Sequence, residues 1–226
     1  MSDPFAAAQV APSTPDAFQA NVDSDDPFAT SSDYAGGDFT PSPGLENLKG
    51  RTVIMIPRKF DPNAKDPNDP NGQKTRELYT VDLVVLNGGE LRYYYNQKAD
   101  PSATPPREAA VLEYVVEDVS PDKPFTVSGF WVPQGAVIGK LKKAHKEGRP
   151  FLGVPAMVPV KADRERGVTP AQVEKTVADW VARGRQGNRP RYSWVLDDGP
   201  TSNMDRAAAV KWWAANREHI PAITPA

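Results

Sequence analysis

The 226-residue chain contains no cysteine. This absence excludes disulfide bonds, a thiolate nucleophile and any zinc or iron–sulfur site held by cysteine. No stretch approaches the ~20 apolar residues that a membrane-spanning helix needs. The first residues, MSDPFAAAQ, have neither a basic cluster nor an apolar run, and so do not form a secretory signal peptide. We therefore expect a cytoplasmic protein with no membrane partner.

Lysine and arginine are absent from the first 48 residues, which carry eight acids. The other 178 residues hold all 27 Lys and Arg and the remaining 21 of 29 acids. Their net charge is therefore +6, against −8 for the first 48 residues. This asymmetry predicts a basic body that binds an anionic partner and an acidic tail that competes for the same surface.

Enzymatic motifs are also missing. His145 and His219 are the only histidines, and no HExxH, GxSxG, Walker or GxGxxG sequence is present. The pair Asp197-Asp198 has the chemistry to hold Mg²⁺, but the Gly-Pro-Thr-Ser that follows favours a role in capping the next helix. We expect a non-enzymatic protein with no catalytic residue, no metal and no cofactor.

Composition divides the chain into three parts. Residues 1–44 are rich in Ala, Ser, Thr, Asp, Pro and Gly without helical or strand periodicity, which predicts a disordered acidic tail. Residues 45–218 have the patterns of one folded domain, and residues 219–226 are expected to form a short second tail.

The folded part combines strand and helix patterns. Strands are predicted at 51–56, 77–87, 91–95, 111–116, 125–132, 151–160 and 192–196. Helices are predicted at 134–147, from an apolar stripe of Val137, Ile138, Leu141 and Ala144, at 169–181, from Thr169 as N-cap followed by Pro170, and at 202–217. Asn87-Gly88-Gly89 predicts a hairpin in which 91–95 returns beside 77–87. Residues 61–72 form three Asp-Pro-Asn units and predict a long loop, whose composition alone resembles a calcium loop. Gly129, inside a strand, predicts a bulge or bend.

This order of elements predicts a mainly β fold of the OB type. An OB-fold is a five-stranded β-barrel, and it has a helix between its third and fourth strands. Further helices are expected in the loop between strands four and five and at the C-terminus. The largest insertions fall in the two loops with which that fold grips oligonucleotides.

Basic and aromatic residues lie close together at several points of these strands and loops. A protein that holds single-stranded nucleic acid needs cations along the phosphates and flat side chains on which bases stack. The predicted nucleic-acid-binding residues are Arg58, Lys59, Arg92, Tyr93, Tyr95, Trp131, Lys140, Lys143, Arg183, Arg185, Arg189, Arg191 and Tyr192.

Each aromatic also has a structural interpretation, because rings on a barrel more often pack in the core. Trp180, Trp212 and Trp213 lie at core spacing on predicted helices, and we assign them to packing. Phe130 and Trp131 face opposite sides of one strand, so one of the two is expected to be buried. The pattern leaves open which one.

The tail pairs acids with phenylalanines. Asp25-Asp26-Pro27-Phe28 resembles the Asp-Asp-Asp-Ile-Pro-Phe tip of bacterial single-stranded DNA-binding proteins, and Ser2-Asp3-Pro4-Phe5 repeats the theme. Those tips end the chain and these do not, so the terminal carboxylate that partners recognise is lacking. The resemblance implies that Asp3, Phe5, Asp25, Asp26 and Phe28 bind replication or recombination proteins.

Residues 45–218 resemble OB-fold single-stranded DNA-binding proteins of bacteriophages, especially those of actinobacterial hosts. The stretches that carry the resemblance are Lys49-Gly-Arg-Thr-Val-Ile, Val81-Asp-Leu-Val-Val-Leu-Asn-Gly and Tyr192-Ser-Trp-Val-Leu-Asp-Asp-Gly-Pro-Thr. The resemblance implies sequence-independent binding of single-stranded DNA in phage DNA replication or recombination, in the host cytoplasm. Two alternatives stay open: a protein-interaction module or virion component, and an RNA-binding phage factor.

Overall fold

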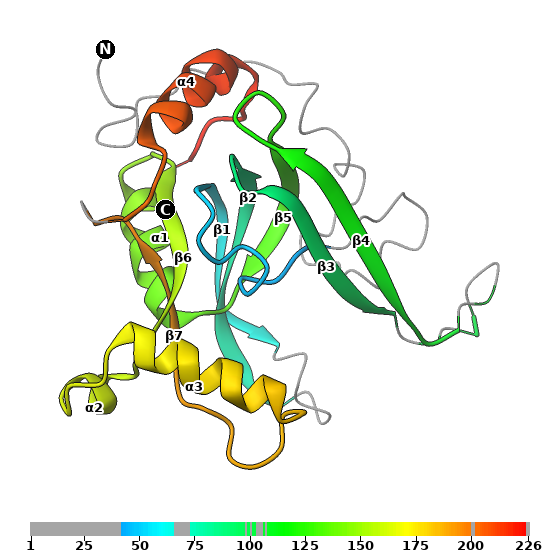
Figure 1. Cartoon of the computed structure of the whole chain (residues 1–226). Coiled ribbons are helices and arrows are strands. Elements are labelled where there is room, and N and C mark those ends of the chain that lie inside the picture. The colour runs from blue at the N-terminus through cyan, green and yellow to red at the C-terminus, as the bar shows by residue number, and fades with distance from the viewer. Residues whose placement is uncertain are drawn as a thin grey trace.

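The computed structural model describes residues 42–65, 73–97, 99, 101–102, 106, 108–199 and 202–224. Its main layer is an antiparallel sheet with the strand order β5-β2-β1-β6-β7 (Figure 1). The strands are β1 (Val53–Lys65), β2 (Thr75–Val85), β5 (Phe125–Val132), β6 (Phe151–Val158) and β7 (Ser193–Asp197). A second sheet pairs β3 (Gly89–Gln97) with β4 (Ala110–Val119).

Four α-helices in the described residues accompany the two sheets. They are α1 (Gly135–Lys146), α2 (Lys161–Arg164), α3 (Pro170–Ala182) and α4 (Arg206–Asn216), and a 3-10 turn at Arg217–His219 follows α4. The prediction of a mainly β protein with three longer helices is confirmed. The main sheet is open, because within the described chain no pairing joins its edge strands β5 and β7, so the expected closed barrel is not formed.

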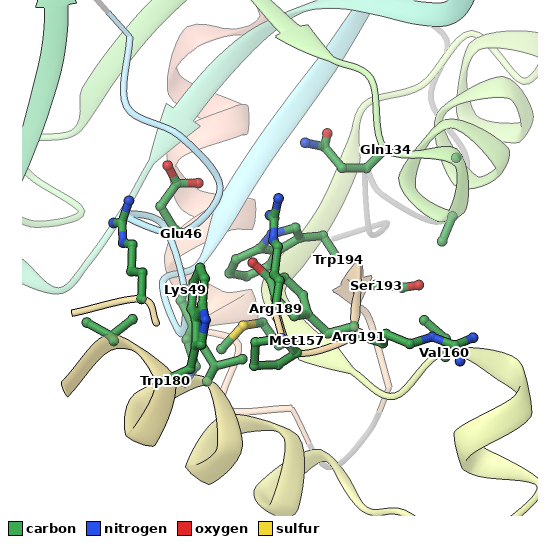
Figure 2. A pocket seen from close by; sticks show the side chains of 17 residues that line it. Glu46, Lys49, Gln134, Met157, Val160, Trp180, Arg189, Arg191, Ser193 and Trp194 are labelled. Carbon is green, nitrogen blue, oxygen red and sulfur yellow. The ribbon is translucent and has the colours of Figure 1, made fainter. Parts of the chain in front are cut away.

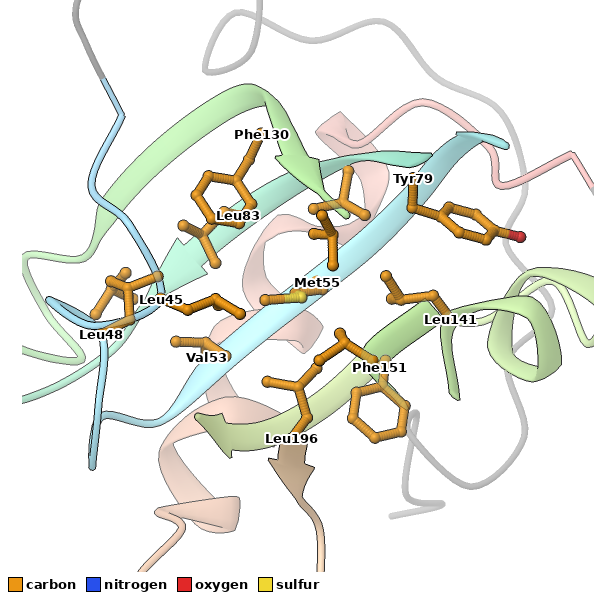
Figure 3. Packing of buried hydrophobic residues seen from close by; sticks show 14 of the residues in the cluster. Leu45, Leu48, Val53, Met55, Tyr79, Leu83, Phe130, Leu141, Phe151 and Leu196 are labelled. Atoms are coloured by element: carbon orange, nitrogen blue, oxygen red, sulfur yellow. The ribbon is translucent and has the colours of Figure 1, made fainter. Parts of the chain in front are cut away.

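Alternation along β1 explains why the sheet is buried on both faces. Val53 and Met55 point into one hydrophobic cluster, whereas Ile54 and Ile56 point into another. The first cluster contains Tyr79, Leu83 and Phe130 from β2 and β5 and Leu141 from α1 (Figure 3). Helix α1 presents the predicted stripe Val137, Ile138, Leu141 and Ala144, all buried, to this side of the sheet.

The second cluster is covered by the C-terminal part of the chain. Trp212 and Trp213 of α4, with Ile220 and Ile223 beyond it, pack on Ile54, Ile56, Val84 and Leu86. Ile220 is 0% exposed and Ile223 is 6% exposed, so residues 219–224 include part of the core. The assignment of Trp212 and Trp213 to packing is confirmed.

The predicted hairpin between 77–87 and 91–95 is wrong. β3 pairs with β4, while β5 occupies the free edge of β2. Asn87 explains the change of direction, because its side chain accepts the Thr52 N–H at 2.7 Å and donates to the Thr52 hydroxyl. Arg51 holds the Asn87 and Glu90 carbonyls, so the chain leaves β2 instead of folding back along it.

Two local predictions have opposite outcomes. Gly129 has φ +71° and lies where the β2–β5 register shifts between Val81 and Leu83, so the predicted bulge is confirmed. Asp61–Lys65, by contrast, belongs to β1 rather than to a loop, with its own register shift between Asp61 and Ala64. The rest of the Asp-Pro-Asn repeat, 66–72, lies outside the described residues. No helix in the described part of the chain has the length and apolarity to cross a bilayer.

Candidate nucleic-acid interface

A cleft of about 890 Å³ opens between α3, the segment that links α3 to β7, and the N-terminal end of α1 (Figure 2). Its lining contains four cations, three large aromatic side chains and a single acid. The cations are Lys49, Arg185, Arg189 and Arg191, the aromatics are Trp180, Tyr192 and Trp194, and the acid is Glu46. Basic and flat side chains therefore meet in one concave surface.

The end of α3 places Trp180 and Arg185 next to each other. Gly184 adopts φ +66°, and its N–H bonds the Val181 carbonyl, while the Arg185 N–H bonds the Trp180 carbonyl at 2.9 Å. This is the Schellman arrangement, in which a left-handed residue ends the helix and reverses the chain. At the other end of α3, Thr169 is the N-cap and Pro170 lies in the first turn, as predicted, and Gln172 completes a capping box with Thr169.

The aromatic side chains of the cleft are half-buried. Tyr192 and Trp194 meet edge to face, with centroids 6.1 Å apart and ring planes at 88°. Trp194 packs on the first hydrophobic cluster, which fixes its ring against the body. Trp180 faces the same cleft from α3, so aromatic rings line it from both sides.

The arginines of the cleft have no counter-ion in the part of the chain that the structure describes. Arg185, Arg189 and Arg191 are exposed, and none forms an ion pair or side-chain hydrogen bond with another residue in the described ranges. Lys49 differs, because its ammonium lies 2.9 Å from the Glu174 carboxylate. Arg183, just outside the cleft, donates to the Asp179 carbonyl at the end of α3. Three guanidinium groups are thus free to meet an anion.

Arg58, a predicted binding residue, has a structural position. Its Nε lies 2.6 Å from the Asp82 carboxylate, and its Nη1 donates to the Pro221 carbonyl at 2.7 Å. Burial raises the pKa of Asp82, although Arg58 and the Gly129 N–H oppose that shift by binding the ionised form. Arg58 therefore holds the C-terminal segment on the sheet.

Other predicted cations are spread over the surface. Arg92 pairs with Glu90 and Glu113 on the β3–β4 hairpin, and these two carboxylates raise its pKa. Lys140 ties α1 to β7 through the Leu196 carbonyl and Asp198. Lys143 is exposed on α1, and Lys59 is half-buried on β1. None of these side chains lines the cleft.

The predicted aromatic residues also differ in how exposed their rings are. Tyr93 is 1% exposed and stacks on Tyr114 at 5.4 Å, so its ring belongs to the core and offers no face to a base. The next residue on β3, Tyr94, is 61% exposed and points outward, and Tyr95 is half-buried. On β5, Phe130 is buried and Trp131 is half-buried at the edge of the sheet.

The cleft thus unites Arg185, Arg189, Arg191 and Tyr192 of the predicted set. Trp194 belongs to the same basic and aromatic cluster of the sequence as Tyr192 and the loop arginines, although it was not among the predicted binding residues. Lys49 was not selected. Trp180 was assigned to packing because its helical spacing is also that of a core residue. The signal for Trp180 was its place one turn before Arg-Gly-Arg at the end of a helix.

The described residues contain no group of three or more His, Asp or Glu side chains arranged to hold a metal ion. His145 is buried against Tyr79, whose hydroxyl lies 3.1 Å from its Nδ1, and burial lowers its pKa. Asp197 accepts the Gly199 N–H and Asp198 pairs with Lys140, so both carboxylates of that pair have local partners. The predicted tail residues Asp3, Phe5, Asp25, Asp26 and Phe28 lie outside the described residues.

No protein-family model, no curated protein and no solved structure matches this chain.

Proposed function

We propose that this protein binds single-stranded DNA without sequence preference, through the cleft, in phage DNA replication or recombination. One observation carries the proposal: three arginines without a counter-ion among the described residues and three aromatic rings line the same concave surface. Guanidinium groups satisfy phosphates, and rings stack with any base because every base has a flat face. The protein acts by binding alone, without a chemical step.

The strand order supports an OB-type topology for the main sheet. With the β3–β4 hairpin counted as an insertion, β1, β2, β5, β6 and β7 become the five strands of the fold. Their order β5-β2-β1-β6-β7 is then third, second, first, fourth, fifth, which is the OB order opened between its third and fifth strands. Helix α1 also falls between the third and fourth strands.

We further propose that the cleft is equivalent to a binding position of OB-folds. The segment between β6 and β7 carries α3 and the cleft arginines, and it corresponds to the loop between strands four and five. That loop is one of the two with which OB-folds bind oligonucleotides. Helix α4 covers the face of β1 and β2 that carries Ile54, Ile56 and Val84. We therefore place the ligand at the segment between β6 and β7.

The acidic tail is proposed to compete with DNA for the cleft. Glu46 and Lys49, which follow the tail directly, line the cleft, so the tail joins the body at the rim of the site. A tethered segment has an effective concentration in the ~mM range near such a site. The tail's carboxylates would then occupy the arginines until DNA displaces them, or recruit replication partners while DNA is bound.

The second candidate is a protein-interaction module, and the β3–β4 hairpin favours it. Tyr94, Val111 and Val115 are exposed at 61%, 68% and 42%, and they lie on paired strands of that hairpin. Apolar groups exposed together mark contact surfaces of proteins. This surface is distinct from the cleft and is compatible with DNA binding elsewhere.

A salt titration of a labelled oligo-dT tests the proposed function. Cations that bind phosphates release counter-ions, so the affinity falls with salt. About four phosphate contacts on a single strand give a log–log slope near −3. A slope near zero, or no binding at low salt, would refute single-stranded DNA binding and favour the protein-interaction module.

A further inference from the structure

The β3–β4 sheet has two outer edges, and only one of them is covered by described residues. On the β3 side, the Arg92 carbonyl accepts a hydrogen bond from the Asn47 side chain, and the Glu90 carbonyl accepts one from Arg51. On the β4 side, no hydrogen bond from a described residue reaches the outer edge of the strand. Figure 1 shows β4 as the strand of this pair that lies farther from the main sheet.

β4 also lacks the features that protect an open edge. Natural proteins protect edge strands with proline, lysine, bulges or a short length, because unpaired N–H and C=O groups template pairing with another chain. β4 is ten residues long and contains no proline, glycine, lysine or arginine. A bulge near Asp118, which has φ +58°, interrupts only its last residues. Residues 110–116 are therefore a regular strand whose outer edge is unprotected.

The side chains of this stretch are arranged symmetrically about Tyr114. Leu112 and Val116 lie two positions away on either side, are apolar, and share the half-buried face of the strand with Tyr114. Glu113 and Val115 lie one position away, on the exposed face. An antiparallel copy of β4 centred on Tyr114 places Leu112 opposite Val116 and Glu113 opposite Val115.

The acids of β4 favour this register over its neighbours. A shift of two residues keeps every side chain on its own face, but it places Glu113 opposite either the partner's Glu113 or the partner's Glu117. Like charges directly opposite each other destabilise a pair of strands. With Tyr114 at the centre, no acid faces another acid, and apolar side chains meet on the half-buried face.

We infer that β4 pairs with β4 of a second copy of this chain, antiparallel and about a two-fold axis at Tyr114. The two hairpins then form one four-stranded sheet with the order β3-β4-β4-β3. This contact uses the same surface on both copies, and the outer edges of that sheet are the covered β3 edges, so the assembly closes as a dimer. The hairpin lines no part of the cleft, so the inference does not depend on DNA binding.

Sedimentation equilibrium of the full chain between about 1 and 300 μM tests the inference. A strand edge is small beside the ~1,600 Å² of a standard interface, so monomer and dimer should be in reversible equilibrium in the micromolar range. The average mass should rise with concentration from the 24.6 kDa of one chain toward twice that value. A mass that stays at one chain throughout, or that continues to rise beyond two, would overturn the inference.

Two replacements of Val115 test the register in opposite directions. Val115 is 42% exposed, so a polar side chain is tolerated there. Val115→Glu creates two pairs of opposed acids with Glu113 in each dimer and should weaken dimerisation about 2- to 30-fold. Val115→Lys creates two pairs of opposite charge and should strengthen it about 2- to 10-fold. Val181→Glu makes the same replacement at a 49%-exposed position on α3 and should leave dimerisation unchanged.

A disulfide cross-link tests the register independently of charge. The chain has no cysteine, so Glu113→Cys and Val115→Cys introduce the only thiols. In this register the two positions lie opposite each other, within the reach of a disulfide. Under mild oxidation, a mixture of the two variants should form cross-linked dimers in clear excess over either variant alone. Equal cross-linking in all three samples, or a shift in the same direction for both charged replacements of Val115, would overturn the pairing at Tyr114.

Discussion

The arginines of the cleft and those of the sheets differ in their partners. Arg58 and Arg92 form ion pairs with carboxylates. Arg185, Arg189 and Arg191 form no ion pair with any described residue. All five were equivalent as basic residues near aromatics in the sequence. The difference teaches that the charge of a residue is visible in the sequence, but its counter-ion depends on strand pairing and chain reversal.

The largest expected effect concerns the structural arginine. Arg58→Met should lower the free energy of unfolding by about 3–5 kcal/mol, because it leaves the buried Asp82 without its charged partner. Affinity for oligo-dT, measured under conditions where the variant is folded, should not change. Chemical denaturation gives the stability, and a loss below about 1 kcal/mol would mean that the pair is not structural.

The next comparison is between two tyrosines that were predicted together. Tyr93→Ala removes a 1%-exposed ring and should cost about 3–5 kcal/mol of stability, as large-to-small core changes do. Tyr192→Ala should instead cost about 1–3 kcal/mol of binding to oligo-dT and little stability. If Tyr93→Ala weakens binding and Tyr192→Ala does not, the cleft is the wrong site.

The sequence predicted individual helices and the strand bulge, but it did not predict which strands and side chains pair. Local patterns predicted α1 from its apolar stripe, α3 from its Thr-Pro cap and the bulge at Gly129. The partner of β3 was not predictable, because the hydrogen bonds of Asn87 to Thr52 join residues 35 positions apart. For the same reason, long-range contacts decided that Tyr93 packs in the core and that Arg58 pairs with Asp82.

A smaller effect is expected from the tail. Removing residues 1–41 should raise the affinity for oligo-dT at least about twofold at low salt, because the competing segment has an effective concentration in the ~mM range. The gain should shrink as salt screens the competition. A full-length variant with the seven tail aspartates changed to Asn is the control for charge, and it should bind as the truncated protein does.

If the truncated protein and the Asn variant bind no more tightly than the intact chain, the tail does not compete for the cleft. If truncation raises affinity while the Asn variant does not, the tail acts by its bulk rather than by its charge. Only the first result would leave the tail as a tether for partners.

The smallest effect concerns His145, the buried histidine of α1. The pKa of His145 is lowered, first by burial and also by Arg58, although a hydrogen bond with the Thr224 backbone opposes this. The folded state therefore favours the neutral ring, and its contribution to stability is complete above about pH 6.5 and falls as the pH drops further. Denaturation at pH 7.5 and 5.5 should show this loss in the wild type and a smaller loss in His145→Gln. An equal loss in both proteins would exclude His145 as its source.

The claim that cleft arginines bind phosphates is tested most directly by replacing all three. Arg185→Ala, Arg189→Ala and Arg191→Ala together should weaken oligo-dT binding about 100-fold at 0.1 M salt and bring the log–log slope from near −3 to near −1. Lys123→Ala, Lys146→Ala and Lys211→Ala together remove the same charge from exposed positions outside the cleft, and should leave the slope unchanged. If both triple variants lose affinity and slope equally, the binding surface is diffuse and the cleft is not the site.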